Sequence, residues 1–200
     1  MKRNHYSVFR KVLSLYRKVA SRVNFFKAKL CLTTQVVYTS KPKCMQKVRF
    51  VGEGKVVLGK CVQLGVVPSP YKSTSEIYIE ARFKGAEVEI GNRVCINNGA
   101  SIIADKSKIS IGEDTLIGPN FTCFDSNFHN ILPNKRLGSD YNCRRVEIGK
   151  NVFIGANVTI LRGAIIGDDS VIGAGCVVNG IIPKGSIVSF GGQRIEQIKY

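Results

Sequence analysis

The stretch from Ile148 to Pro183 reads IGKNVF IGANVT ILRGAI IGDDSV IGAGCV VNGIIP when it is written in blocks of six. An aliphatic residue opens every block, and glycine follows it in four of the six. An α-helix repeats its apolar face near 3.6 residues, and a half-buried strand alternates with a period of two. A period of six therefore indicates that each block is one structural unit stacked on the previous one, as in a solenoid.

Short repeats of six residues are typical of a parallel β-helix, which makes the chain all-β in class. The opening aliphatic residue is expected to point inward, and Asn or Asp suits the corners because both accept left-handed backbone conformations. The smaller inward positions are expected at Val152, Ala156, Val158, Val171, Ala174 and Val177, and the corners at Asn151, Asn157, Asp168 and Asp169. The alternative is a β-sandwich of short strands, which six in-phase blocks disfavour.

The charge of the chain is concentrated at its N-terminus. The net charge is +16, and the first 50 residues carry 13 Lys and Arg and no acidic residue. The sequence therefore predicts a basic helical arm over residues 1–45 and a β-helix over residues 46–200. Within the arm, residues 5–30 are expected to form one amphipathic helix, because apolar residues recur at helical spacing from Val8 to Leu30.

Two interpretations of this helix remain open. A basic amphipathic helix can lie on an anionic membrane surface, at the inner face of the plasma membrane. It can equally pack its apolar face on the open end of the solenoid and leave its basic face in solvent. Nucleic-acid binding is not expected, since no recognised motif accompanies the charge.

Composition also limits the location and the chemistry. No stretch approaches the roughly 18 apolar residues of a membrane span, and no signal-peptide pattern is present, so a cytoplasmic protein is expected. The seven cysteines are irregularly spaced and include no CxxC pair, which is neither a disulfide framework nor a zinc site. No metal is expected.

The repeat also covers much of the chain before Ile148, but it stops between residues 124 and 147. This polar segment must leave the stack as a projecting loop, and such insertions usually lie on a functional face. It contains His129, and the only other histidine is His5 in the basic arm. Histidine is the side chain best suited to take a proton near neutral pH, although a loop histidine alone is more often an ordinary surface residue.

Residues 50–198 resemble the hexapeptide-repeat O-acetyltransferases, and above all the sugar, capsule and lipopolysaccharide enzymes. The pattern IGPNFTCFDSNFHNI, a loop, and then IGKNVFIGANVTIL with IGDDSVIGAGCVV carries the resemblance. The resemblance implies a left-handed β-helix, a homotrimer, and acetyl-CoA as the donor in a groove between neighbouring subunits. It also implies that a loop histidine, which His129 matches, is the general base on the acceptor hydroxyl.

The resemblance suggests further site residues. Asn98 matches an active-site amide that lies one coil before the histidine, although it can also be a corner residue. Asp125 resembles an acid that orients the imidazole, contacts the acceptor or shapes the turn. The positions that match the CoA-binding residues are Gly155, Ala156, Gly173 and Ala174, with Arg194 and, more weakly, Lys184 for a CoA phosphate. Two departures, FGGQR at 190–194 and Asn179-Gly180, put the phosphate contacts in doubt.

These features predict an O-acetyltransferase that acts on a bacterial surface glycan or its lipid-linked precursor. Acetylation of a small sugar, an amine or an antibiotic is the second hypothesis, and a non-catalytic scaffold is the third. A carbonic anhydrase on the same fold needs three zinc-binding histidines, and only His129 lies in the repeat region. The acceptor, its hydroxyl and the length of the acyl group are left open.

Overall fold

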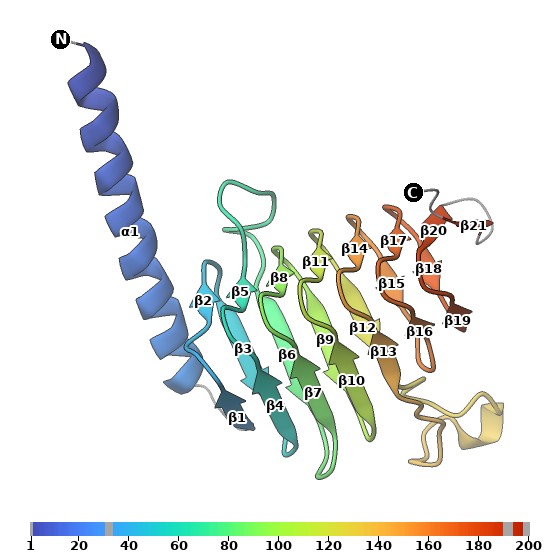
Figure 1. Cartoon of the computed structure of the whole chain (residues 1–200). Coiled ribbons are helices and arrows are strands. Elements are labelled where there is room, and N and C mark those ends of the chain that lie inside the picture. Colours follow the sequence, from blue (N-terminus) through green and yellow to red (C-terminus); the bar gives the residue numbers. More distant parts are fainter. Residues whose placement is uncertain (1, 31–33, 190–193, 198–200) are drawn as a thin grey trace.

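The computed structural model describes residues 2–30, 34–189 and 194–197, with side chains for residues 11–28 and 34–189. One helix, α1 (Lys2–Leu30), precedes a stack of short strands that run almost entirely parallel to one another (Figure 1). The strands form three sheets, and successive strands of the chain enter the three sheets in turn. Each turn of the chain is thus one triangular coil of a parallel β-helix, as the period of six predicts, and the helix is left-handed, as the resemblance implies.

The first sheet contains β1 (Gln35–Tyr38), β4 (Lys55–Leu58), β7 (Glu87–Ile90), β10 (Lys108–Ile111), β13 (Val146–Ile148), β16 (Ile165–Ile166) and β19 (Ile181–Ile182). The second contains β2 (Lys43–Cys44), β5 (Gln63–Leu64), β8 (Cys95–Ile96), β11 (Leu116–Ile117), β14 (Phe153–Ile154), β17 (Val171–Ile172), β20 (Ser186–Ser189) and β21 (Arg194–Gln197). The third contains β3 (Val48–Val51), β6 (Ile77–Ala81), β9 (Ser101–Ala104), β12 (Thr122–Phe124), β15 (Thr159–Ile160) and β18 (Val177–Val178). The β20–β21 pair is antiparallel.

The solenoid begins earlier than the sequence indicates. Because β1 and β2 already pair with β4 and β5, the first coil starts at Gln35 rather than at residue 46. The reason is that no aliphatic–glycine step follows β1 or β2, and the first such step, Val51-Gly52, comes only after β3.

Residues that open the sixfold blocks do fill the interior. Ile148 pairs with Ile166, and Ile154 pairs with Ile172, so that equivalent side chains stack along the axis, all of them buried. The predicted smaller inward positions are only partly correct: Val152 and Val158 are buried. Ala156 and Val171 are half-buried, Ala174 is exposed and Val177 is 56% exposed. A strand alternates its faces, so the second inward residue lies two places before the aliphatic one, not next to it.

The corners are also mostly as predicted. Asn151, Asn157 and Asp169 have φ values of +52°, +57° and +59°. Asp168 is not such a corner residue. Its carboxylate accepts a hydrogen bond from the backbone N–H of Lys150 in the neighbouring coil, at 2.7 Å. Glycine at position 155 is required by stacking rather than by φ, since a Cβ there would come 2.6 Å from the backbone N of Ala174.

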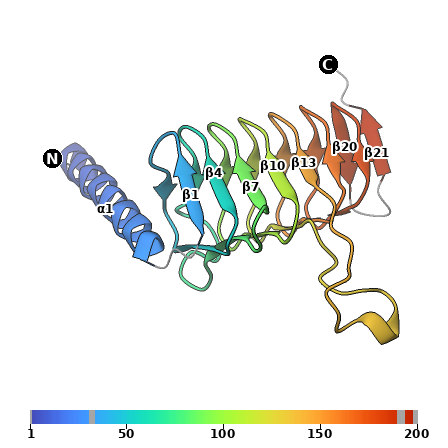
Figure 2. The same cartoon turned by 90° about the horizontal axis from the view of Figure 1, so that it is seen from below.

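Helix α1 is attached to the first coil by the part nearest its C-terminus. Asn24 donates to the carbonyl of Cys44 at 3.2 Å, and the N–H of Cys44 donates to the Ser21 hydroxyl at 3.0 Å. Phe25 and Ala28 are buried against the same end of the solenoid. Towards its N-terminus, α1 extends beyond the stack (Figures 1 and 2).

The face that α1 turns to the solenoid is not its apolar stripe. An exposed stripe runs along the helix on the side away from Ser21 and Ala28, and consists of Val12, Leu15, Tyr16, Val19, Val23 and Phe26. Packing of the apolar face on the open end of the solenoid, with the basic face in solvent, is therefore wrong. The docked face buries only Phe25 and Ala28 and bonds the backbone of Cys44 through Ser21 and Asn24, so these contacts determine which face of the helix docks.

Candidate active site

The repeat is interrupted between β12 and β13, where residues 125–145 leave the stack as a projecting loop (Figure 2). The loop contains one short 3₁₀-helix, η1 (Pro133–Lys135). Beneath it the stack continues without a break, since β10 pairs directly with β13. The loop therefore departs from the corner between the third and first sheets and is held there by a rigid scaffold.

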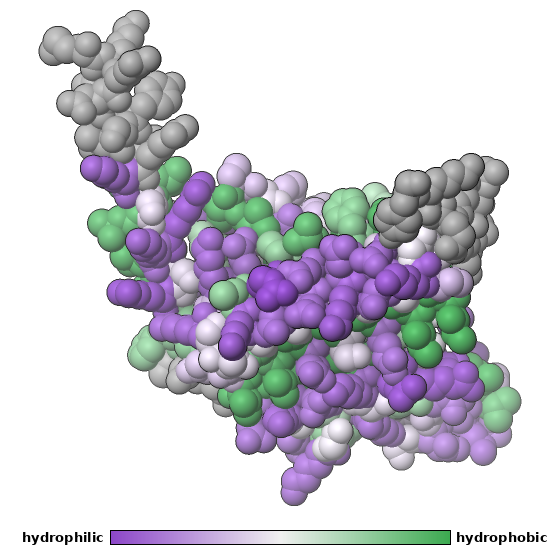
Figure 3. Space-filling view, in the orientation of Figure 1, coloured by the Kyte–Doolittle hydropathy of each residue, from purple (hydrophilic) through white to green (hydrophobic). Residues whose placement is uncertain are grey.

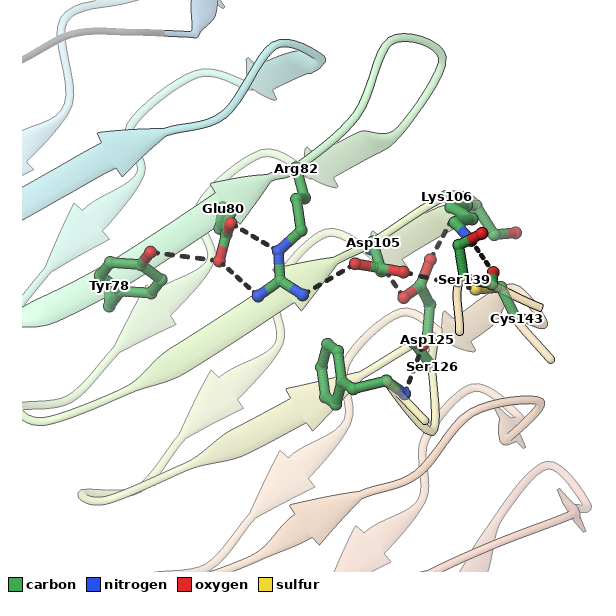
Figure 4. Close-up of polar contacts among 11 residues, drawn as sticks. Tyr78, Glu80, Arg82, Asp105, Lys106, Asp125, Ser126, Ser139 and Cys143 are labelled. Atoms are coloured by element: carbon green, nitrogen blue, oxygen red, sulfur yellow. Dashed lines mark hydrogen bonds and ion pairs between the residues drawn. The ribbon is translucent and has the colours of Figure 1, made fainter. Parts of the chain in front are cut away.

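A buried polar network fixes the base of this loop (Figure 4). Asp125 is fully buried, and its two carboxylate oxygens accept the backbone N–H groups of Asp105 and Ser107, each at 2.7 Å. Burial raises the pKa of the Asp125 carboxyl, and these two backbone donors act in the opposite direction. Arg82 bridges Glu80 and buried Asp105, at 2.8 Å to each. The network joins the loop to the two preceding coils.

The returning strand of the loop completes this base. The N–H of Arg144 donates to the Asp125 carbonyl at 2.8 Å, and Cys143 forms a β-bridge with Ser126. Farther along the stack, Arg162 donates to the Asn127 side chain at 2.6 Å. Both ends of the loop are thus anchored, and this anchoring fixes the position of the residues immediately after Asn127.

His129 lies just beyond this anchored base and is exposed. Its Nδ1 is 2.9 Å from the carbonyl oxygen of Arg136. A carbonyl can only accept, so this contact requires a hydrogen on Nδ1 and leaves Nε2 of the neutral ring as the free acceptor. The preceding residue, Phe128, has φ +60° and packs its ring against Phe124 and the Arg82 guanidinium. The imidazole is therefore oriented, with Nε2 available for a substrate.

Asn98 lies at another corner of the coil and has other partners. It is fully buried, between β8 and β9, whereas the His129 loop follows β12. Its amide donates to the carbonyls of Val66 and Pro70 and accepts the N–H of Val66. These bonds hold the loop over residues 66–70, so within one chain Asn98 does not join His129.

The predicted CoA positions separate into two groups. Gly155, Ala156, Gly173 and Ala174 follow β14 and β17 and lie together at the corner between the second and third sheets, on adjacent coils. Small side chains there leave the backbone of this corner accessible, which suits the close approach of an extended ligand. Lys184 instead precedes β20 and borders a groove of about 830 Å³ along the corner between the first and second sheets. It pairs with Asp169 at 3.2 Å. Arg194 lies in β21, and its side chain is outside the described residues.

Sequence reasoning missed Arg82 and Asp105, which support the loop from beneath. A signal was present, because Asp105 directly follows the strand that buries Ile102 and Ala104, in a repeat that otherwise keeps its interior apolar. The sequence gives no signal for the Arg136 carbonyl as the partner of His129, since every residue has a backbone carbonyl. Over the described residues, no three His, Cys, Asp or Glu side chains are grouped closely enough to bind a metal ion. No described helix is long and apolar enough to span a bilayer.

The anchored base of the loop gives a first prediction. Replacing Asp125 with asparagine keeps one acceptor oxygen but puts an N–H₂ donor against a backbone N–H. An unsatisfied buried donor costs about 1–3 kcal/mol, and we expect the free energy of unfolding to fall by that amount. Urea denaturation measures it, with Asp140→Asn in the exposed part of the loop as the matched control. Equal stability of the two variants would contradict this account of the loop base.

Comparisons with known proteins agree with this architecture. Residues 145–180 match the family model described as "Bacterial transferase hexapeptide (six repeats)". The galactoside O-acetyltransferase of Lactococcus lactis is 38% identical over 112 residues, which are 56% of this chain and 52% of that protein. The chain thus spans about half the length of the curated relatives it matches.

Solved structures show the same likeness. A hexapeptide-repeat acetyltransferase from Vibrio cholerae, complexed with acetyl-CoA, is 31% identical, with a TM-score of 0.53 and coverage of 56% of this chain and 61% of that one. The polysialic-acid-specific acetyltransferase NeuO is 25% identical, with a TM-score of 0.64 and coverage of 82% and 66%. In its repeat and in its left-handed β-helix fold, this chain is similar to the hexapeptide-repeat acetyltransferases.

Proposed function

We propose that the chain is an acetyl-CoA-dependent O-acetyltransferase that acts on a hydroxyl of a bacterial surface glycan or of its lipid-linked precursor. The observation that carries the proposal is the orientation of His129, whose Nδ1 bonds to the Arg136 carbonyl in the loop that interrupts the β-helix. Relatives named as galactoside and polysialic acid O-acetyltransferases support a sugar hydroxyl as the acceptor.

The proposed reaction uses His129 as a general base. Nε2 takes the proton of the acceptor hydroxyl while its oxygen attacks the carbonyl carbon of the acetyl thioester. The carbon–sulfur bond then breaks, and the leaving CoA thiolate takes the proton from the imidazolium. The hydrogen bond from Nδ1 to a carbonyl stabilises the imidazolium that forms between these two steps. Asp125 acts in this scheme by shaping the turn that presents His129.

We assign the donor to the corner formed by Gly155, Ala156, Gly173 and Ala174. The exposed Ala174 and the half-buried Ala156 give this corner small side chains on adjacent coils, so an extended pantetheine chain can lie against the backbone. Within one chain, the His129 loop leaves from a different corner, with the third sheet between the two. The site is therefore proposed to be completed between two copies of the chain. Lys184 and Arg194 remain candidates for a CoA phosphate.

The outer surface of the second sheet supports a homotrimer. An apolar column runs along it in register, from Leu116 to Phe153, Val171 and Ile187. Leu116 and Phe153 are 51% and 53% exposed in the single chain. Figure 3 shows green side chains along the upper rim of the solenoid, over the strands of this sheet. The outer surface of the first sheet instead carries Glu87, Glu89, Lys108 and Glu147 over its central strands, although Ile181 at its end is apolar and exposed. This difference favours the second sheet as the surface that a further copy would cover.

An acceptor panel tests the proposed function. The full chain is incubated with acetyl-CoA and, separately, a galactoside, an oligosialic acid and glucosamine, with CoA release and product mass as readouts. Transfer to a sugar hydroxyl supports the proposal. Transfer to the amine alone makes the chain an N-acyltransferase, and hydrolysis of acetyl-CoA without any product contradicts the proposal.

The exposed apolar stripe of α1 supports peripheral contact with the cytoplasmic face of the plasma membrane, where a lipid-linked acceptor would lie. Lys11 and Arg22 lie along one edge of the stripe and Lys27 along the other, so an anionic surface would meet cations on both sides of the apolar face.

We expect the double variant Leu15→Glu/Val19→Glu to bind phosphatidylglycerol vesicles at least about tenfold more weakly, because apolar burial is replaced by like-charge repulsion. Vesicle flotation measures it. Ile181→Glu, at an exposed apolar residue on the first sheet, is the matched control. Binding that survives the double variant would contradict membrane contact through α1.

A further inference from the structure

A cationic pocket lies between α1 and the turn that joins β1 to β2. Its volume is about 810 Å³. Nine residues line it, namely Leu13, Ser14, Arg17, Lys18, Ser21, Arg22, Lys41, Pro42 and Lys43. Five of these are Lys or Arg and none is acidic. The cationic pocket is on the side of α1 that faces the solenoid, away from the exposed apolar stripe.

The cations of this pocket lack anionic partners within the part of the chain that the structure describes. No ion pair involves any of the five, whereas eleven ion pairs join Lys and Arg to acids elsewhere in the solenoid. Lys43 donates to the side chain of Gln63, and Lys41 lies over the Phe25 ring, which are both neutral contacts. Positive charges that share a pocket repel one another, and the repulsion falls only when an anion enters.

The side chain of Arg17 is a second, independent observation that points to an anionic ligand. Its Nε is buried and has no hydrogen-bond partner, and no other buried side-chain nitrogen or oxygen among the described residues shares that condition. A buried donor without an acceptor is costly, and a charged one especially so. A guanidinium offers donors in a planar fork that matches the oxygens of a phosphate.

From these observations we propose that the cationic pocket is a binding site for a phosphate or diphosphate group. Arg17 is the central ligand, Lys18, Arg22, Lys41 and Lys43 supply the surrounding charge, and the hydroxyls of Ser14 and Ser21 can donate to further oxygens. A volume of about 810 Å³ exceeds what one phosphate fills, so the pocket has room for a larger molecule that carries the group. The group comes either from a lipid headgroup or from a soluble phosphorylated compound. The proposal does not rest on acetyl transfer, because the pocket belongs to α1 and the first coil.

Pyrophosphate is the probe for this site. Isothermal titration calorimetry measures its affinity for the full chain, with sodium chloride at matched ionic strength as the blank. The variant Arg17→Gln/Lys41→Gln should bind at least about tenfold more weakly, because it removes two cations that would form charge-assisted hydrogen bonds to the probe. The control Lys60→Gln/Lys84→Gln removes the same charge from exposed residues of the solenoid and should bind as the wild type does.

A thermal melt distinguishes a loss of pyrophosphate binding from a loss of the folded state. Without pyrophosphate, Arg17→Gln/Lys41→Gln should melt at or above the wild-type temperature, because it removes an unsatisfied donor and like-charge repulsion. A soluble ligand source predicts that pyrophosphate stabilises the wild type but not this variant. A lipid source predicts in addition that phosphatidic acid vesicles compete with pyrophosphate, and that Leu15→Glu/Val19→Glu leaves pyrophosphate affinity unchanged. Equal weakening by both charge variants, or binding of a single-stranded oligonucleotide but not of pyrophosphate, would overturn the proposal.

Discussion

Replacing His129 with alanine should lower the kcat of acetyl transfer by about 10²–10⁴-fold, the range that a positioned general base contributes. A sugar hydroxyl is a poor nucleophile until its proton is removed during attack, and Nε2 of His129 is the group that the loop leaves free to take it. The loss should appear in kcat rather than in the KM for acetyl-CoA, because the proposed donor corner is separate from the loop.

The comparison needs a control for the substitution itself. His129 is exposed, so its replacement should leave the melting temperature unchanged. The variant His5→Ala, which removes the only other histidine of the chain, should retain wild-type kcat. A His129→Ala variant that transfers acetyl groups at the wild-type rate would remove His129 from the mechanism.

Replacing Phe153 with aspartate should prevent the proposed homotrimer from forming and abolish transfer. Phe153 is 53% exposed, so one chain tolerates a carboxylate there. In a trimer the carboxylate would be buried beside apolar neighbours in every interface, at a cost of more than about 3 kcal/mol per copy. Association should weaken more than about 100-fold as a result.

Sedimentation analysis together with the transfer assay measures both effects. Ile181→Asp places the same charge on the first sheet, at a residue that is 72% exposed, and should remain trimeric and active. A monomeric and fully active Phe153→Asp variant would show that one chain holds a complete site. A trimeric one would show that the apolar column is not the interface.

Most of the fold could be predicted because it depends on a local rule that repeats. Every block from Ile148 onward reports the same inward position, and the stacking of Ile148 on Ile166 follows from it. Alternation within each two-residue strand was harder to predict, because the corner residues shift the phase. For this reason Ala174 and Val177, which are small and apolar, face outward. At the N-terminus, polar contacts of Ser21 and Asn24, rather than the apolar stripe, determine how α1 docks.

The candidate site could be predicted only where one residue type carries the chemistry. His129 was identifiable as a candidate because the chain has a single histidine in its repeat region, and that histidine lies in the longest break in the stack. The buried bonds of Asn98 to residues 66–70 depend on how a distant loop folds over the corner, which no spacing reveals. The same holds for Asp125, whose two backbone donors come from the preceding coil.

The central claim is that His129 of one chain works with the donor corner of another. A complementation assay tests it most directly, by mixing His129→Ala subunits with Ala174→Trp subunits, in which the indole would block the exposed donor corner. Each variant alone should be inactive. Randomly reassembled mixtures should recover about a quarter of the wild-type rate, since every mixed trimer keeps one intact site of its three. Mixtures that stay as inactive as the separate variants would contradict a site shared between chains.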